Sequence, residues 1–308
     1  MLAAFLATIF YALSSVFATR SARLLGAVKA NLGRMTLALL LLGLWAHLCG
    51  QGLRGGALGW FLVSGIIGYG FGDICLFQAL PRIGPRLTMI IIHCLAVPLA
   101  AMLEMFWLGN ALHLREVACI CVILAGVYIA LTPVRHFNIK ASTFRAGTIF
   151  AFGASLAQAG STIISRKANL VADSFHTPID GATAAYQRMI GGIATTIIFT
   201  LVMKGFQSRS AANAPVPPAT AEAHQRKNIG WLFVVMNAVA GPTLGVAFFQ
   251  RAVSQLPGAI VQPVVSTTPV FTIPLAYWID GDRPSARSIA GGIIAVVGTV
   301  LLAISLNR

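Results

Sequence analysis

Long apolar stretches recur along the whole chain, and short polar segments separate them. A helix that crosses the hydrocarbon core of a membrane needs about 20 apolar residues. Membrane strands would instead show polar and apolar residues in alternation, and no stretch of this length shows that pattern. Backbone polar groups in lipid must be satisfied within the segment, so the stretches are predicted to be helices. We predict an all-α membrane protein with ten spans, at residues 2–19, 30–49, 57–80, 86–108, 114–132, 146–165, 182–203, 229–252, 258–279 and 287–306.

One block of this pattern occurs twice. Residues 59–132 align without a gap with residues 231–304, which pairs Pro85 with Pro257, Gly109 with Gly281 and Gly126 with Gly298. The starts of the two halves also match, with Arg34 on Arg188. Each half contains five spans, and an odd number places the two halves in opposite orientations across the membrane. Inverted repeats of this kind are an architecture of secondary transporters.

The repeat defines the domain organisation that we expect. The first five-helix repeat covers residues 1–132, a linker covers 133–145, and the second repeat covers 146–308. Residues 206–228 contain Ala-Pro-Val-Pro-Pro-Ala-Thr and are predicted to form a disordered loop. A tolerated surface insertion explains this loop more simply than a regulatory role.

Composition excludes several classes of protein. The chain is 57% hydrophobic and only 10% charged, whereas soluble domains carry about 25% charged residues. Its net charge of +14 comes from scattered basic residues without an aromatic-basic face, so we expect no nucleic-acid partner. No His-Glu-x-x-His, Gly-x-Ser-x-Gly or Walker motif is present, and we predict neither an enzyme nor a bound cofactor or metal. An intramembrane lipid-modifying enzyme and a passive solute channel are the alternatives to a carrier.

The tandem five-helix repeat and its paired arginines resemble the EamA-type drug/metabolite transporters. The paired short linkers at residues 81–85 and 254–258 and the helix-ending Gly109 and Gly281 fit the same family. Members often carry Leu-Gly-Glu after the fourth helix of a repeat, whereas this chain has Leu-Gly-Asn and Asp-Gly-Asp at residues 108–110 and 280–282. The resemblance implies a carrier for small polar or amphipathic metabolites, such as amino acids or their derivatives, in a bacterial cytoplasmic (inner) membrane. Inverted repeats imply that it works by alternating access.

The orientation of the chain in the membrane has two opposed predictions. Basic residues lie mainly after the odd-numbered spans, for example at Arg20, Arg82, Arg145 and Lys204. Because cytoplasmic loops are enriched in Lys and Arg, this count places both termini outside the cytoplasm. The resemblance implies cytoplasmic termini instead. Labelling of an engineered C-terminal cysteine from outside alone would favour the charge count.

Three ionisable residues within the spans are candidates for coupling transport to protons: Asp73, His93 and Glu104. An ionisable group in a span costs a few kcal/mol, so it normally faces the interior of the bundle. Asp73 follows Gly70-Phe71-Gly72 and is predicted either to accept a proton or bind a cationic substrate group, or else to pair with an arginine. His93 and Glu104 lie close to three helical turns apart and share a stripe with Val97 and Ala100.

Arg34 and Arg188 occupy equivalent positions near the start of the second helix of each repeat. A guanidinium suits bidentate binding of a carboxylate or phosphate. The alternative is that both side chains extend to the membrane interface. The sequence is compatible with both roles, substrate binding and anchoring at the membrane interface.

Neutral polar residues also recur at helical spacing, and we include Tyr11, Gln158, Gln262 and Ser266 among the candidates for lining the solute path. Each could equally bond to a neighbouring helix, a contact worth about 0.6 kcal/mol on average. The expected partners are thus a small-molecule substrate, the lipid bilayer and a coupling proton. The sequence does not define the oligomeric state.

Overall fold

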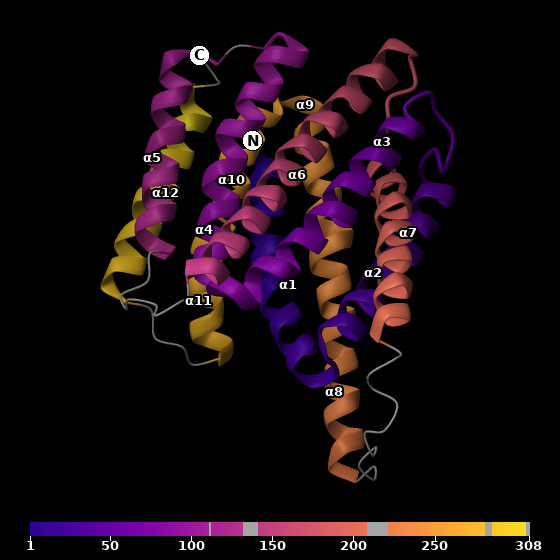
Figure 1. The fold of residues 1–308 in the computed structure, drawn as a ribbon. Helices are drawn as coiled ribbons and strands as arrows, with labels where there is room; N and C mark the ends of the chain where they lie inside the picture. Colours follow the sequence, from indigo (N-terminus) through magenta and orange to yellow (C-terminus); the bar gives the residue numbers. More distant parts are fainter. Residues whose placement is uncertain (111, 132–140, 208–220, 281–284, 306–308) are drawn as a thin grey trace.

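The computed structural model describes residues 1–110, 112–131, 141–207, 221–280 and 285–305. These residues form a bundle of helices joined by short turns (Figure 1). The first half contains α1 (Leu2–Leu25), α2 (Ala27–Leu48), α3 (Leu58–Gly65), the π-helix η1 (Ile66–Gly72), α4 (Asp73–Leu108) and α5 (Leu114–Leu131). The second half contains α6 (Ala141–Ser174), α7 (Gly181–Gln207), α8 (Ala221–Ala238), the π-helix η2 (Val239–Gly245), α9 (Val246–Gln255), α10 (Gly258–Val265), α11 (Thr268–Asp280) and α12 (Ala286–Ser305).

The helices correspond to the ten predicted spans, and the all-α prediction is confirmed. The third span consists of α3, η1 and the start of α4, and the fourth span is the rest of α4. The ring centroids of Trp60 and Trp107 lie 5.9 Å apart although the residues flank this whole segment. The chain therefore reverses direction between them, as two antiparallel spans require.

The two halves run in opposite directions through the molecule. In Figure 1, α1 descends whereas its counterpart α6 ascends, and α5 descends beside the ascending α12. Gly126 of α5 comes so close to α12 that a Cβ atom at residue 126 would meet the backbone nitrogen of Ala295. The alignment of the halves maps this pair onto Gly298 and Ile123, where a Cβ atom at residue 298 would lie 3.0 Å from the Ile123 nitrogen. One contact thus occurs twice, which is the signature of a pseudo-twofold axis between inverted repeats.

Several predicted boundaries differ from the structure. The expected short linker at residues 81–85 is helical, because α4 continues through it. Residues 206–207 and 221–228 of the predicted disordered loop belong to α7 and α8, since the Ala-, Glu- and Gln-containing flank is compatible with a helix. Residues 208–220 of that loop and residues 132–140 of the predicted linker lie outside the described part of the chain. The helix α6 begins at Ala141, ahead of the predicted start of the sixth span.

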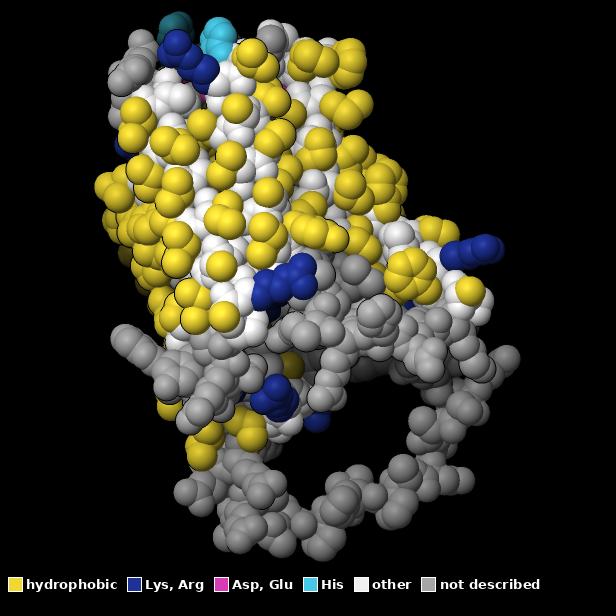
Figure 2. Space-filling model, turned by 90° about the vertical axis from the view of Figure 1, so that its left-hand side faces the viewer, with side chains coloured by type: hydrophobic (Ala, Val, Ile, Leu, Met, Phe, Trp, Pro, Cys, Tyr) yellow, Lys and Arg dark blue, Asp and Glu magenta, His cyan; other side chains and the backbone are white. Residues whose placement is uncertain are grey.

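The outer surface of the bundle matches a lipid environment. Six helical stretches among the described residues are long and apolar enough to cross a membrane. Exposed large apolar side chains include Leu44 (61%), Phe106 (77%) and Ile198 (62%). Figure 2 shows hydrophobic side chains over the middle of one face, with Lys and Arg towards its ends. The chain is therefore an integral membrane protein with a mainly apolar exterior.

Two π-helices lie at nearly equivalent positions of the two repeats and approach the centre of the bundle. Each carries two glycines four residues apart: Gly68 and Gly72 in η1, and Gly241 and Gly245 in η2. A Cβ atom at Gly68 or Gly241 would collide with the hydroxyl of Ser161 or Ser14, respectively. The glycines thus allow η1 to pack closely on α6, and η2 on α1. Short π-helical segments inside α-helices occur frequently at functional sites.

Candidate functional site

A polar cavity of about 250 Å³ lies where the two halves meet. Both π-helices contribute to its wall, and α1, α2, α4, α6, α7, α9, α10 and α11 supply the rest. The lining residues are Tyr11, Ser14, Arg34, Gly68, Tyr69, Asp73, His93, Gln158, Ser161, Thr162, Arg188, Gly241, Pro242, Val246, Phe249, Val265 and Thr268. Polar groups in a membrane-embedded interior are costly unless they are paired or used. The concentration of so many in one chamber makes it the candidate functional site.

Arg188 is the most firmly held charge in the cavity. Its side chain is only 5% exposed, and its Nη2 donates a hydrogen bond to Ser161 Oγ at 2.6 Å. The guanidinium carbon lies 5.4 Å from the centroid of the Tyr69 ring, which is a cation–π distance. The buried Nε has no hydrogen-bond partner among the described residues. Arg188 therefore retains a donor for an anionic group.

A glycine in the first half determines how closely α7 approaches this region. A Cβ atom at Gly65 would collide with the backbone carbonyl of Arg188. Only a residue without a side chain permits α3 to lie against α7 here. The backbone position of Arg188 thus depends on contact between the two halves.

Asp73 and Arg34 form the second, less constrained part of the charged lining. Asp73 is the first residue of α4, directly after η1, and its buried Oδ2 has no hydrogen-bond partner in the described structure. Arg34 of α2 is close enough to act on this carboxylate electrostatically. Its Nε donates to Asn31 Oδ1 on the same helix at 2.7 Å. The predicted pairing of Asp73 with an arginine and its predicted exposure to a solute path are thus both compatible with this arrangement.

Three other predicted residues line the same cavity. Tyr11 enters from α1, His93 from α4 and Gln158 from α6. The Tyr11 ring lies 6.4 Å from the Phe249 ring, centroid to centroid, and fills the space that Gly245 leaves open. The cavity thus brings together six sequence-predicted residues from five helices.

The remaining three predicted residues do not line the cavity. Glu104 is fully buried near the end of α4, where its Oε2 accepts the Gly258 N–H at 2.9 Å and its Oε1 accepts the Asn110 side-chain amide at 2.9 Å. Gln262 lies 3.5 Å from the Thr162 hydroxyl, between α10 and α6. Ser266 donates to the carbonyl of Pro263 where the ninth span is broken between α10 and α11. All three side chains join helices or helix ends rather than face the chamber.

Sequence reasoning missed Tyr69, Ser14 and Ser161 as cavity residues. Tyr69 lies one helical turn before Asp73, and that spacing could have indicated a shared face. The two serines pack against glycines of the π-helices, a relationship that only the tertiary structure reveals. Each lies almost at the matching position of its own repeat.

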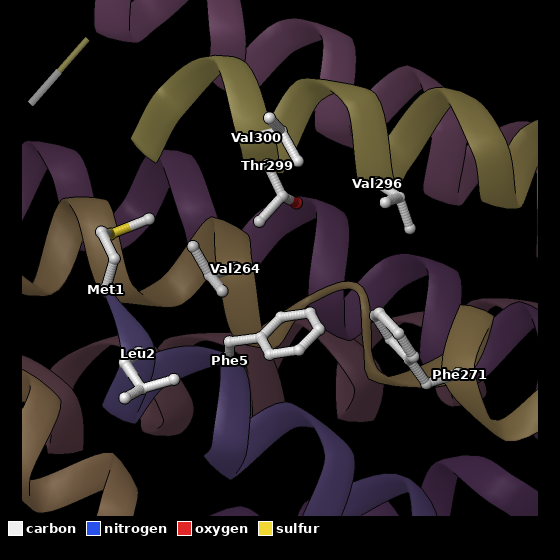
Figure 3. Close-up of a pocket in the computed structure, with 8 residues that line it drawn as sticks. All are labelled: Met1, Leu2, Phe5, Val264, Phe271, Val296, Thr299 and Val300. Carbon is white, nitrogen blue, oxygen red and sulfur yellow. The ribbon is translucent and has the colours of Figure 1, made fainter. Parts of the chain in front are cut away.

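A second hollow of about 330 Å³ lies near the chain termini, between α1, α10, α11 and α12. Figure 3 shows seven apolar residues and Thr299 around it. The Thr299 hydroxyl already donates to Ala295 O in its own helix. The side chains that line this groove offer a solute no free polar group, so the groove is suited to contact with lipid.

The inverted halves, the lipid-compatible exterior and the polar chamber together define a membrane transporter. A family model described as "EamA-like transporter family" matches residues 1–132 and 145–304. The chain therefore belongs to the EamA-like transporter family, which is a family of drug/metabolite transporters and not of enzymes. The resemblance drawn from the sequence is confirmed.

Comparison with other proteins supports the fold. No curated protein matches the chain by sequence. A solved structure described only as "Crystal structure of protein" matches with a TM-score of 0.73 and 18% identity, over 100% of this chain and 97% of the other. At this identity, the similarity extends to the fold alone. Family membership makes a membrane and a small-molecule substrate the partners of this protein, without specifying the solute.

Proposed function

We propose that this protein is a secondary transporter that carries an amino acid or a close derivative across a bacterial cytoplasmic membrane by alternating access. The observation that supports this most directly is the central cavity between inverted halves, which combines one carboxylate with two guanidinium groups. A zwitterion complements such a lining, because its carboxylate matches arginine and its ammonium group matches aspartate. A guanidinium is also suited to two parallel hydrogen bonds with one carboxylate.

In this proposal, Arg188 binds the carboxylate of the solute. Its Nε is buried without a partner among the described residues, and its Nη2 is already oriented by Ser161. Asp73 binds the ammonium group through its unpartnered Oδ2. Arg34 lies close enough to Asp73 to offset part of its charge. His93, Tyr11 and Gln158 contribute polar contacts around the same chamber.

Contacts at the upper end of Figure 1 support a conformation that is closed on that side. Arg166 of α6 donates through Nη1 to the carbonyls of Val253 and Ser254, at 3.0 and 2.7 Å, where α9 ends. Glu104 of α4 accepts from the first N–H of α10, across the boundary between the halves. Alternating access requires the Glu104–Gly258 contact to break when the chamber opens on this side, and rocking of one half against the other would do this. The Arg166 contacts lie within the second half and hold the end of α9 against α6.

We also propose that a proton drives transport, with Asp73 as its principal carrier and His93 as a second candidate. Both residues line the chamber, so a proton and an ammonium group would compete for the same carboxylate. This competition couples uptake of one to release of the other. Glu104 lies outside the chamber and is assigned a structural role.

Purified protein in proteoliposomes tests the proposal. Under an imposed pH gradient, saturable accumulation of a labelled amino acid above its external concentration is expected. Uptake that neither saturates nor runs uphill would indicate a channel, and a chemically altered lipid would indicate an enzyme. Liposomes that contain the Arg188→Ala variant provide the matched control, because this change removes the proposed carboxylate contact.

A further inference from the structure

A smaller, mainly apolar pocket of about 210 Å³ lies beside the central cavity, between α2, η1, α4 and α7. We call it the side pocket. It is lined by Asn31, Leu32, Tyr69, Gly70, Asp73, Ile74, Gln78, Thr196, Phe199 and Thr200. Its walls come from the start of α2 and the later part of α7, and α7 ends in the lower part of Figure 1.

The side pocket and the central cavity share two wall residues, Tyr69 and Asp73. A molecule that touches the Asp73 carboxylate can therefore extend into either space. The two spaces differ in chemistry, because the central cavity contains both arginines with His93 whereas the side pocket is mainly apolar. One solute that spans both would need a charged end and an apolar end.

Several polar atoms of the side pocket already have partners. The Asn31 Oδ1 accepts from Arg34, and Gln78 Oε1 accepts from Arg82 Nη1 at 2.7 Å. The hydroxyls of Thr196 and Thr200 donate to carbonyls of their own helix at 2.9 and 2.8 Å. What these residues offer a ligand is thus mainly their apolar surface. Asp73 Oδ2, which belongs to a residue shared with the central cavity, is buried without a hydrogen-bond partner among the described residues.

The side pocket also differs from the lipid-facing surface of the same helix. Ile197 and Ile198 of α7 are 44% and 62% exposed and point outwards, whereas the neighbouring Phe199 is half-buried and lines the pocket. A space that shares Tyr69 and Asp73 with the polar chamber and has Phe199 in its wall is better placed for the solute than for a lipid tail.

We propose that the side pocket binds the apolar side chain of the transported amino acid while its charged groups remain in the central cavity. The preferred substrate class is therefore an amino acid with an extended apolar side chain. Leu32, Ile74 and Phe199 then determine specificity. This inference rests on the proposed function, because it assigns a place to the part of the solute that the charged groups do not bind.

Competition experiments with a homologous series test this inference. Uptake of labelled L-alanine into proteoliposomes is measured while unlabelled alanine, 2-aminobutyrate, norvaline or norleucine competes. Burying a methylene group contributes about 0.8 kcal/mol, so inhibition should strengthen about fourfold per added methylene until the pocket is full. The variant Thr196→Phe fills the pocket and should abolish this dependence while alanine still competes. Its control, Ile197→Phe, adds the same ring on the exposed side of α7 and should retain it.

Phe199→Ala is a second variant, which enlarges the side pocket instead of filling it. The strongest competitor should therefore shift to a longer side chain, whereas the exposed-site control Ile198→Ala should behave as wild type. If all members of the series compete equally, or if Thr196→Phe leaves the length dependence unchanged, the side pocket holds lipid and the inference is wrong. If no amino acid competes or is taken up at all, the proposed function fails and this inference fails with it.

Discussion

Arg34 and Arg188 occupy equivalent positions in the two repeats, but their surroundings differ. Arg188 is 5% exposed, bonded to Ser161 of another helix and stacked near Tyr69. Arg34 is less buried and bonds to Asn31 of its own helix. In the proposed function, the second repeat therefore supplies a fixed charge, whereas the first supplies one that can respond to Asp73 and to a solute.

The acidic and basic groups of the cavity follow the same asymmetry. The alignment of the halves pairs Asp73 with Gly245 and His93 with Val265. Of these four residues, Asp73, His93 and Val265 line the cavity and Gly245 does not. At Gly245, the space is filled by the Tyr11 ring instead. Duplication therefore preserved the scaffold, while the candidate coupling groups are confined to the first repeat.

The largest expected effect is that of Asp73→Asn, which removes the carboxylate that has no counterpart in the second repeat. The amide cannot release a proton, so accumulation driven by a pH gradient should be abolished. Exchange of labelled for unlabelled amino acid without a gradient should persist at a reduced rate. Uptake assays on proteoliposomes with and without the gradient measure both. Undiminished gradient-driven uptake would exclude Asp73 as the coupling residue.

Gly245→Ala tests the close packing of η2 against Tyr11 of α1 at the position that is equivalent to Asp73. The added Cβ atom would lie 2.8 Å from the Tyr11 ring, and overpacking of this kind costs about 1–3 kcal/mol. Thermal denaturation of the detergent-solubilised protein should show a lower midpoint. Gly160→Ala on α6 is the matched control, since a Cβ atom there would meet no described atom within 4 Å apart from its chain neighbours and the nearby backbone of its own helix. Equal midpoints for the two variants would contradict close packing of η2 on α1.

Lysine substitutions of the two arginines compare the repeats directly. Lysine keeps the charge but loses the planar pair of donors, so Arg188→Lys should raise KM about tenfold, the effect of losing a charged hydrogen bond. Arg34→Lys should raise it less, because Arg34 is assigned to Asp73 rather than to the solute. Initial-rate measurements over a range of amino-acid concentrations give both values. A larger effect at Arg34 would reverse the assignment of the two roles.

The smallest expected effect is that of Glu104→Gln at the contact between α4 and α10. Glutamine retains an acceptor for the Gly258 N–H but loses the charge, so stability should fall by about 1 kcal/mol. Thermal denaturation measures this loss, and the pH dependence of uptake should match wild type. A lost or displaced pH dependence would return Glu104 to the coupling candidates.

Periodicity and the repeat were sufficient to predict the helical class, the ten spans and the inverted halves, because lipid permits few alternatives to a helix. They could not place the helix breaks. The pair of prolines around Ser266 indicated an interruption of the ninth span, but the proline-containing segment at residues 81–85 remained helical. Local propensity is similar at the two sites, and packing against the rest of the bundle decides between them.

Within the candidate site, the sequence alone identified the ionisable residues, because any such group inside a span requires a reason to be there. It could not determine which of them meet. Asp73, His93 and both arginines converge on one chamber, whereas Glu104 is on the same stripe of α4 as His93 yet bonds to the start of α10. Helical spacing shows which residues share one face of a helix, but it does not show which other helix packs against that face. The crossing of helices from the two halves supplies that neighbour, and only the tertiary structure determines it.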